Sequence, residues 1–136
     1  WGNKMMLQRL LLLMALSFFG FIGWVIYLAN TGQKSLLFDL VAAIPYGDKL
    51  GHFCLFGLLT LFINLAFKFK TIKVVGHEIY LAVLIVSTFV VLEEFSQYFV
   101  ATRTLDVFDL IADFLGIAVF SAISLWLSKK LYPVKP

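Results

Sequence analysis

Charged residues are scarce in this chain of 136 residues, where they make up 14% of the composition. An average soluble domain contains about 25%, so the shortage argues against a soluble globular protein. The chain has a single cysteine, Cys54, which excludes an intrachain disulfide and gives no information on the redox compartment. No basic stretch is interleaved with aromatic residues, so we expect no binding to nucleic acid.

Hydrophobic residues are correspondingly abundant. They make up 62% of the chain, and the mean hydropathy is +0.97, whereas about 45–50% apolar residues is usual for soluble domains. The composition therefore predicts an integral membrane protein. Its length fits one compact domain, residues 1–136, with a few spans and no room for a separate soluble domain.

The hydrophobic segments predict an all-α membrane protein, a four-transmembrane-helix bundle whose spans are residues 10–28, 50–67, 79–99 and 107–127. The first segment lacks a small-residue cleavage site followed by a polar mature domain, so we interpret it as a span rather than a signal peptide. Between the first two spans, residues 35–44 are expected to form a short amphipathic helix that lies along the membrane interface. We therefore expect membrane lipids to be partners of the protein.

The distribution of basic residues predicts the orientation. With both termini in the cytoplasm, eight of the eleven lysines and arginines lie inside, and only Lys34, Lys49 and Arg103 lie outside. This arrangement obeys the positive-inside rule, and the inverted topology would break it. We therefore expect a multi-pass membrane protein whose outer ends carry seven of the eight carboxylates, all but Glu78.

Polar side chains recur at helical spacing on these outer ends. Asp48 and His52 are four residues apart and share one face of the second span. The apolar run of the third span is only about fourteen residues long, short of the roughly twenty that a bilayer requires, so its last turns must carry Glu93, Glu94 and Gln97. The fourth span opens with a third group at spacings of three and four, namely Asp106, Asp109 and Asp113. Three helix ends thus direct polar groups to one depth.

Simpler explanations exist for several of these groups. Asp39, Lys49 and Asp106 are as easily explained as solvated residues at helix ends, and an acid in the first turn of a helix stabilises the macrodipole. Asp113 and Glu94 lie too deep for that explanation and need partners. Arg103 is the expected counter-ion, because a guanidinium can bind two carboxylates at once. A purely structural ion-pair network is therefore an alternative to a binding site.

Two pairs of small residues, four apart, predict close helix packing and no more: Gly47 with Gly51, and Ala112 with Gly116. Asn64 is expected to bond a neighbouring helix rather than a ligand.

Two stretches resemble the signatures of the VanZ-like family of small bacterial membrane proteins. The first is Asp48-Lys49-Leu50-Gly51-His52-Phe53, with Phe56 following. The second is Glu93-Glu94-Phe95-Ser96-Gln97-Tyr98-Phe99, then Arg103, Asp109, Asp113 and Gly116. The chain departs from the family pattern at Ala101-Thr102, where the family often has Pro-Gly, and at Phe120, where a further glycine is common. Neither departure removes a charged residue.

The family takes its name from a protein associated with resistance to the glycopeptide teicoplanin. The resemblance implies a multi-pass protein with a role at the outer face of the bacterial cytoplasmic membrane, where a lipid-linked cell-wall precursor or a glycopeptide would be the partner. We expect the ligand to contact eight residues: Asp48, His52, Glu93, Glu94, Gln97, Arg103, Asp109 and Asp113.

Other classes of function stay open. An intramembrane enzyme would use His52 as a base oriented by Asp48, Glu94 and Asp113 as acids, and Arg103 to stabilise an anionic transition state. No serine or cysteine nucleophile stands out, so such an enzyme would activate water. We expect no cofactor and no metal, although one histidine among carboxylates would suit magnesium or calcium better than zinc. A small transporter or a structural assembly protein are the remaining alternatives.

Overall fold

The computed structural model describes residues 2–32, 36–100 and 106–131. They form α1 (Gly2–Asn30), α2 (Leu36–Ala42), α3 (Gly47–Ala66), β1 (Thr71–Val74), β2 (His77–Tyr80), α4 (Leu81–Ser96), the short 3-10 helix η1 (Gln97–Phe99) and α5 (Val107–Leu131). Four stretches are long and apolar enough to cross a membrane: Lys4–Asn30, Gly47–Ala66, Leu81–Phe99 and Val107–Lys130. The prediction of four helices long and apolar enough to span a membrane is confirmed. Helix α2 falls inside the predicted segment 35–44, and its position along the interface stays a prediction.

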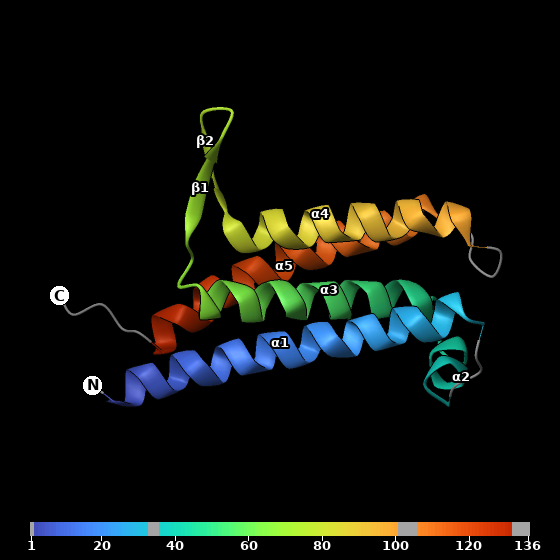
Figure 1. Cartoon of the computed structure of the whole chain (residues 1–136), viewed down its shortest axis with the longest axis horizontal. Helices are drawn as coiled ribbons and strands as arrows, with labels where there is room; N and C mark the ends of the chain where they lie inside the picture. The colour runs from blue at the N-terminus through green and yellow to red at the C-terminus, as the bar shows by residue number, and fades with distance from the viewer. Residues whose placement is uncertain (1, 33–35, 101–105, 132–136) are drawn as a thin grey trace.

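Helix α3 lies at the centre of the bundle, with α1 on one side and α5 and α4 on the other (Figure 1). The main core cluster joins all four long helices: Ile22 from α1, Phe56 and Leu59 from α3, Val86 and Val90 from α4, and Ile117 from α5. The start of α1, the end of α5 and the hairpin lie at one end of the bundle, and α2 lies at the other. Long helices that follow one another along the chain run in opposite directions, so the start of α3, the end of α4 and the start of α5 meet at the α2 end, and the neighbours α3 and α5 run parallel (Figure 1).

The β-hairpin corrects the all-α prediction, and it moves the start of the third span from residue 79 to Leu81. Its strands pair in antiparallel register, with Val74 opposite His77, and leave a two-residue turn. Both turn residues have positive φ, 50° at Val75 and 79° at Gly76, which is the backbone of the tight hairpin turn that matches strand twist. The β-branched residues before the turn favour the strand, and Ile79 belongs to it instead of to the span.

Close approach of α3 and α5 depends on two glycines. A Cβ on Gly116 would overlap the backbone carbonyl of Phe53, and a Cβ on Gly57 would overlap the ring of Phe120. Phe120, at the position where the family resemblance expects glycine, is therefore accommodated by Gly57 on the opposite helix. The predicted packing role of Gly116 is confirmed. The predicted Gly47–Gly51 pair is only half right, because Gly47 packs tightly on α2 while a Cβ on Gly51 would meet nothing within 4 Å.

Deeper in the same interface, the Asn64 side chain donates hydrogen bonds to the hydroxyls of Ser121 (3.1 Å) and Ser124 (3.2 Å). All three residues are buried, and the bonds join α3 to α5. Asn64 therefore bonds a neighbouring helix, as expected.

Substitution of Gly57 by alanine is expected to lower the free energy of unfolding by about 1–3 kcal/mol, since the added methyl group forces Phe120 out of its position. The double variant Gly57→Ala/Phe120→Ala should lose less than the sum of the two single losses, because the smaller side chain removes the overlap with the ring, although the Gly116 carbonyl stays close. Detergent-solubilised protein can be compared by thermal melting. Additive effects of the two changes would contradict the contact.

Candidate functional site

The start of α3 is fixed against α2, and this fixes the direction of its first polar side chains. Tyr46, before the helix, is left-handed with φ 56°, and the Gly47 amide donates a 2.9 Å hydrogen bond to the Ile44 carbonyl. Gly47 also lies so close to the Val41 carbonyl that no side chain would fit there. Asp48, Lys49 and His52, in the first two turns, are thereby held at the end of the bundle where α5 begins.

Lys49 is the centre of the ionic contacts at this end. Its ammonium contacts Asp106 Oδ2 at 2.6 Å, Asp109 Oδ1 at 2.7 Å and Asp48 Oδ2 at 2.8 Å. Of the two explanations left open for Lys49 and Asp106, the one that makes them merely solvated helix-end residues is therefore wrong. The ammonium of Lys49, on the long flexible side chain of an α3 residue, contacts the two acids at the start of α5 and so connects the two helix ends.

Asp106 has a second structural role. Its Oδ1 accepts a 2.9 Å hydrogen bond from the Phe108 amide, so Asp106 is the N-cap of α5 and satisfies one of the unpaired amides of the first turn. The hydrogen bond from Lys49 and this amide together hold the pKa of the Asp106 carboxyl below its usual value. Asp106 thus combines helix capping with ion pairing.

His52 pairs with the deepest acid of the site. Its Nδ1 lies 2.8 Å from Asp113 Oδ1, and its Nε2 lies 3.8 Å from Asp109 Oδ2. Asp113 is fully buried, and its other oxygen, Oδ2, accepts no hydrogen bond from the residues that the structure describes. The prediction that Asp48 orients His52 is wrong: Asp48 is largely exposed and bonds Lys49, and α5 supplies the partners of the imidazole.

The end of α4 contributes a second group of acids. The Gln97 amide nitrogen donates to both oxygens of Glu93, each at 3.0 Å, and to Glu94 Oε2 at 3.1 Å. Glu94 Oε1 accepts a 2.9 Å hydrogen bond from the Asp106 backbone amide, which links this group to the start of α5. Glu94 and Gln97 are 0% and 1% exposed, so both are part of the interior and not solvated end residues.

Seven of the eight predicted ligand-contacting residues therefore gather at one end of the bundle, from three helices. The eighth, Arg103, lies outside the described residues, and its role as counter-ion stays a prediction. Asp39, on α2, is exposed, as a solvated residue should be. Sequence reasoning missed Lys49 as a member of the site, although its place inside the first signature was a signal.

The carboxylates of Asp48, Asp106 and Asp109 come close enough together to hold a cation. The ammonium of Lys49 is bonded to all three, so a positive charge of the chain itself serves that purpose. The remaining acids, Glu93, Glu94 and Asp113, contact Gln97 and His52 instead.

Fold and site together define a multi-pass helical membrane protein with a carboxylate-rich polar site at one end of a four-helix bundle. A family model described as VanZ/LLP1 matches residues 6–128, and the chain belongs to this family. The suspected resemblance is thereby confirmed over nearly the whole chain. No curated protein and no solved structure matches the chain.

Proposed function

We propose that the protein binds or remodels a component of the bacterial cell envelope, or a glycopeptide, through the acid-rich site on the extracytoplasmic side of the cytoplasmic membrane. The observation that carries the proposal is the convergence of Glu94, Asp109 and Asp113 with His52 at one end of the bundle. Burying so many carboxyl groups is costly for a scaffold alone. Family membership supports a role of the teicoplanin-resistance type in general terms.

The excess of acids over bases restricts the chemistry of the ligand. Six carboxyl groups share the site with Lys49 and His52, and even Arg103 would leave the acids in the majority. Such a site favours ammonium, amide and hydroxyl donors over phosphate. The peptide stem of a lipid-linked cell-wall precursor carries such donors, and so does a glycopeptide.

Binding can be measured directly with the purified protein in lipid nanodiscs. Teicoplanin and a soluble pentapeptide stem are the two probes, and we expect saturable calorimetric binding of at least one. Glu94→Gln, which keeps the size of a buried side chain but replaces its carboxyl group with an amide, should weaken it by about tenfold, or about 1.4 kcal/mol. Absence of saturable binding for both probes would contradict the proposal.

The side of the membrane rests on the positive-inside rule and has its own test. In a Cys54→Ala background, Thr102→Cys should react with a membrane-impermeant thiol reagent applied to intact cells, whereas Thr71→Cys in the hairpin should not. Permeabilised cells serve as the control, since both cysteines should then react. Labelling of Thr71→Cys in intact cells would place the acid-rich site in the cytoplasm and overturn the extracytoplasmic role.

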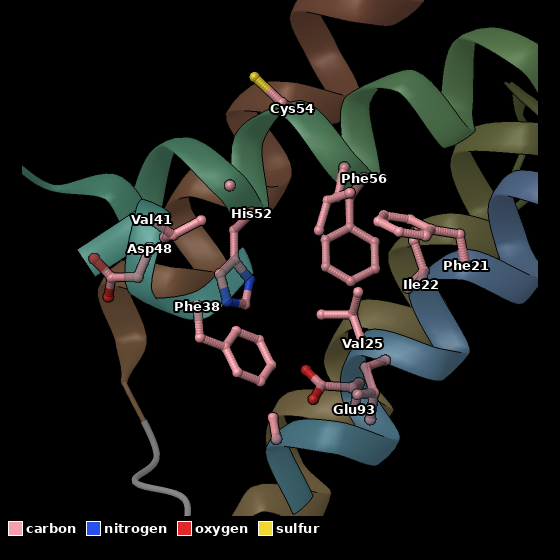
Figure 2. A pocket seen from close by; sticks show the side chains of 14 residues that line it. Phe21, Ile22, Val25, Phe38, Val41, Asp48, His52, Cys54, Phe56 and Glu93 are labelled. Atoms are coloured by element: carbon pink, nitrogen blue, oxygen red, sulfur yellow. The ribbon is translucent and has the colours of Figure 1, made fainter. Parts of the chain in front are cut away.

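One observation favours an intramembrane enzyme as the second candidate. His52 is held by Asp113 at 2.8 Å and faces a cavity (Figure 2), which is the arrangement of a general base positioned by a carboxylate. An enzyme of this kind would activate water for attack on a lipid-linked substrate. It is distinguished from a binding protein by turnover: a hydrolysed headgroup would appear over time with wild-type protein and not with His52→Gln.

A further inference from the structure

A cavity of about 330 Å³ lies beside the polar site, between α1, α2 and the first half of α3. Its walls are mostly apolar, with Phe21, Ile22 and Val25 from α1, Phe38 from α2, and Gly51 and Phe56 from α3. Asp48, His52 and Glu93 are its polar lining residues. The volume is at the lower end of the roughly 300–1,000 Å³ usual for ligand sites.

Figure 2 shows how the polar lining meets the apolar walls. The imidazole of His52 and the carboxylate of Glu93 point into the space that Phe38 and Val25 border, and Phe56, Phe21 and Ile22 enclose its other part. The sulfur of Cys54 points away from the cavity. The cavity therefore has an apolar part and a polar part, and the polar part belongs to the acid-rich site.

Gly51 has no side chain, so it leaves free space where α3 borders the cavity. A Cβ there would meet no heavy atom within 4 Å, whereas Gly47, Gly57 and Gly116 are each closely packed against another element. A larger apolar side chain at position 51 would fill this space. Because Gly51 lines the cavity and packs against no other element, the space stays available for an occupant. The polar residues lie on only one side of the cavity, and they therefore determine the orientation of that occupant.

We propose that this cavity binds one hydrocarbon chain of an amphiphile whose cationic or hydroxyl-bearing head contacts Asp48, His52 and Glu93. The inference deepens the proposed function and rests on it, because these residues belong to the same site. A hydrocarbon chain that leaves the bilayer for an apolar cavity gains little, as lipid is equally apolar. Selection therefore depends on the head, and the acid-rich lining repels an anionic phosphate.

Three probes with the same chain and different heads test the inference: dodecylamine, dodecyl maltoside and dodecyl phosphate, added to the protein in phosphatidylcholine nanodiscs. Retention is measured by native mass spectrometry after release from the nanodisc. We expect dodecylamine or dodecyl maltoside to be retained about tenfold more than dodecyl phosphate, the equivalent of about 1.4 kcal/mol. Equal retention of dodecyl phosphate would overturn the choice of head.

The chain-binding part is tested by filling the cavity. Gly51→Leu should reduce retention of dodecylamine and dodecyl maltoside about tenfold. Gly23→Leu is the matched control, because Gly23 is exposed on α1 and its Cβ also meets nothing within 4 Å, and retention should stay unchanged. Val25→Phe fills the same cavity from α1 and replaces Gly51→Leu if that variant does not fold. Unchanged retention in the filled variants would overturn the chain site.

The two proposals can fail separately. If Gly51→Leu retains the probes while substitutions at Glu94 still weaken the binding of teicoplanin or the pentapeptide stem, the chain site is wrong and the proposed function stands. If filling the cavity expels the probes while neither teicoplanin nor the stem binds the wild type, the amphiphile site stands and the proposed function is wrong.

Discussion

Replacement of Lys49 by methionine is expected to lower the free energy of unfolding by about 3 kcal/mol, because three carboxylates lose the ammonium that they share. Methionine keeps the apolar stem of the side chain, so the loss reports charge more than packing. The effect is at the lower end for a buried ion pair, since Lys49 is 25% exposed, but Asp109 is only 11% exposed and cannot regain full hydration. Thermal melting in detergent micelles measures the change.

Two further variants identify the cause. Asp109→Asn in the Lys49→Met background should recover part of the loss, because it removes a carboxylate left without its cation. Lys70→Met, an exposed lysine at the opposite end of the bundle, should change stability by less than about 0.5 kcal/mol. A similar loss in Lys49→Met and Lys70→Met would show that the three ion pairs do not hold the helix ends together.

The sequence was sufficient to predict that Asp48, Glu94 and Asp113, with most of the other acids, meet at one end of the bundle. Hydrophobic length determined the four spans, and the alternation of span directions then placed the ends that carry Asp48, Glu94 and Asp113 at one depth. Spacings of three and four were enough to predict that acids share a helix face. These are local properties, and a periodic pattern specifies them without knowledge of the packing.

Pairing within the site depends on packing and was not predictable. His52 and Asp48 share a face of α3, but the contact of His52 is set by the close approach of α5 at Gly116, whose backbone neighbour is Phe53. Asp113 lies one turn before Gly116 and is thereby brought to 2.8 Å from the imidazole. Spacing along one helix gives no register between two helices.

Neither the role of Lys49 nor the hairpin was predicted, and the reasons differ. A lysine at the end of a span is usually solvated, and only the positions of Asp106 and Asp109 on another helix turn it into a shared counter-ion. The hairpin turn places a β-branched residue, Val75, at positive φ. Sequence patterns disfavour that choice, so the Val-Gly turn gives a weaker signal than Asn-Gly would.

The largest functional effects are expected from His52→Gln and Asp113→Asn. Both should abolish the change in teicoplanin susceptibility that overexpression of the intact protein is expected to produce, as measured by the inhibitory concentration in growing cells. Each variant keeps a hydrogen-bonding group of similar size, so the unfolding free energy should change by only about 1 kcal/mol. His52 faces the cavity, and Asp113 holds its ring, so binding should suffer far more than folding.

A scaffold variant shows whether loss of stability alone explains the phenotype. Asn64→Ala removes the bonds to Ser121 and Ser124 and should destabilise the protein by about 1–3 kcal/mol, yet it lies in the other half of the bundle and should keep the phenotype. If the His52 and Asp113 variants also keep it, the acid cluster is structural. If Asp113→Asn stays active while His52→Gln does not, Asp113 acts as a hydrogen-bonding group that orients the imidazole, and its charge is dispensable.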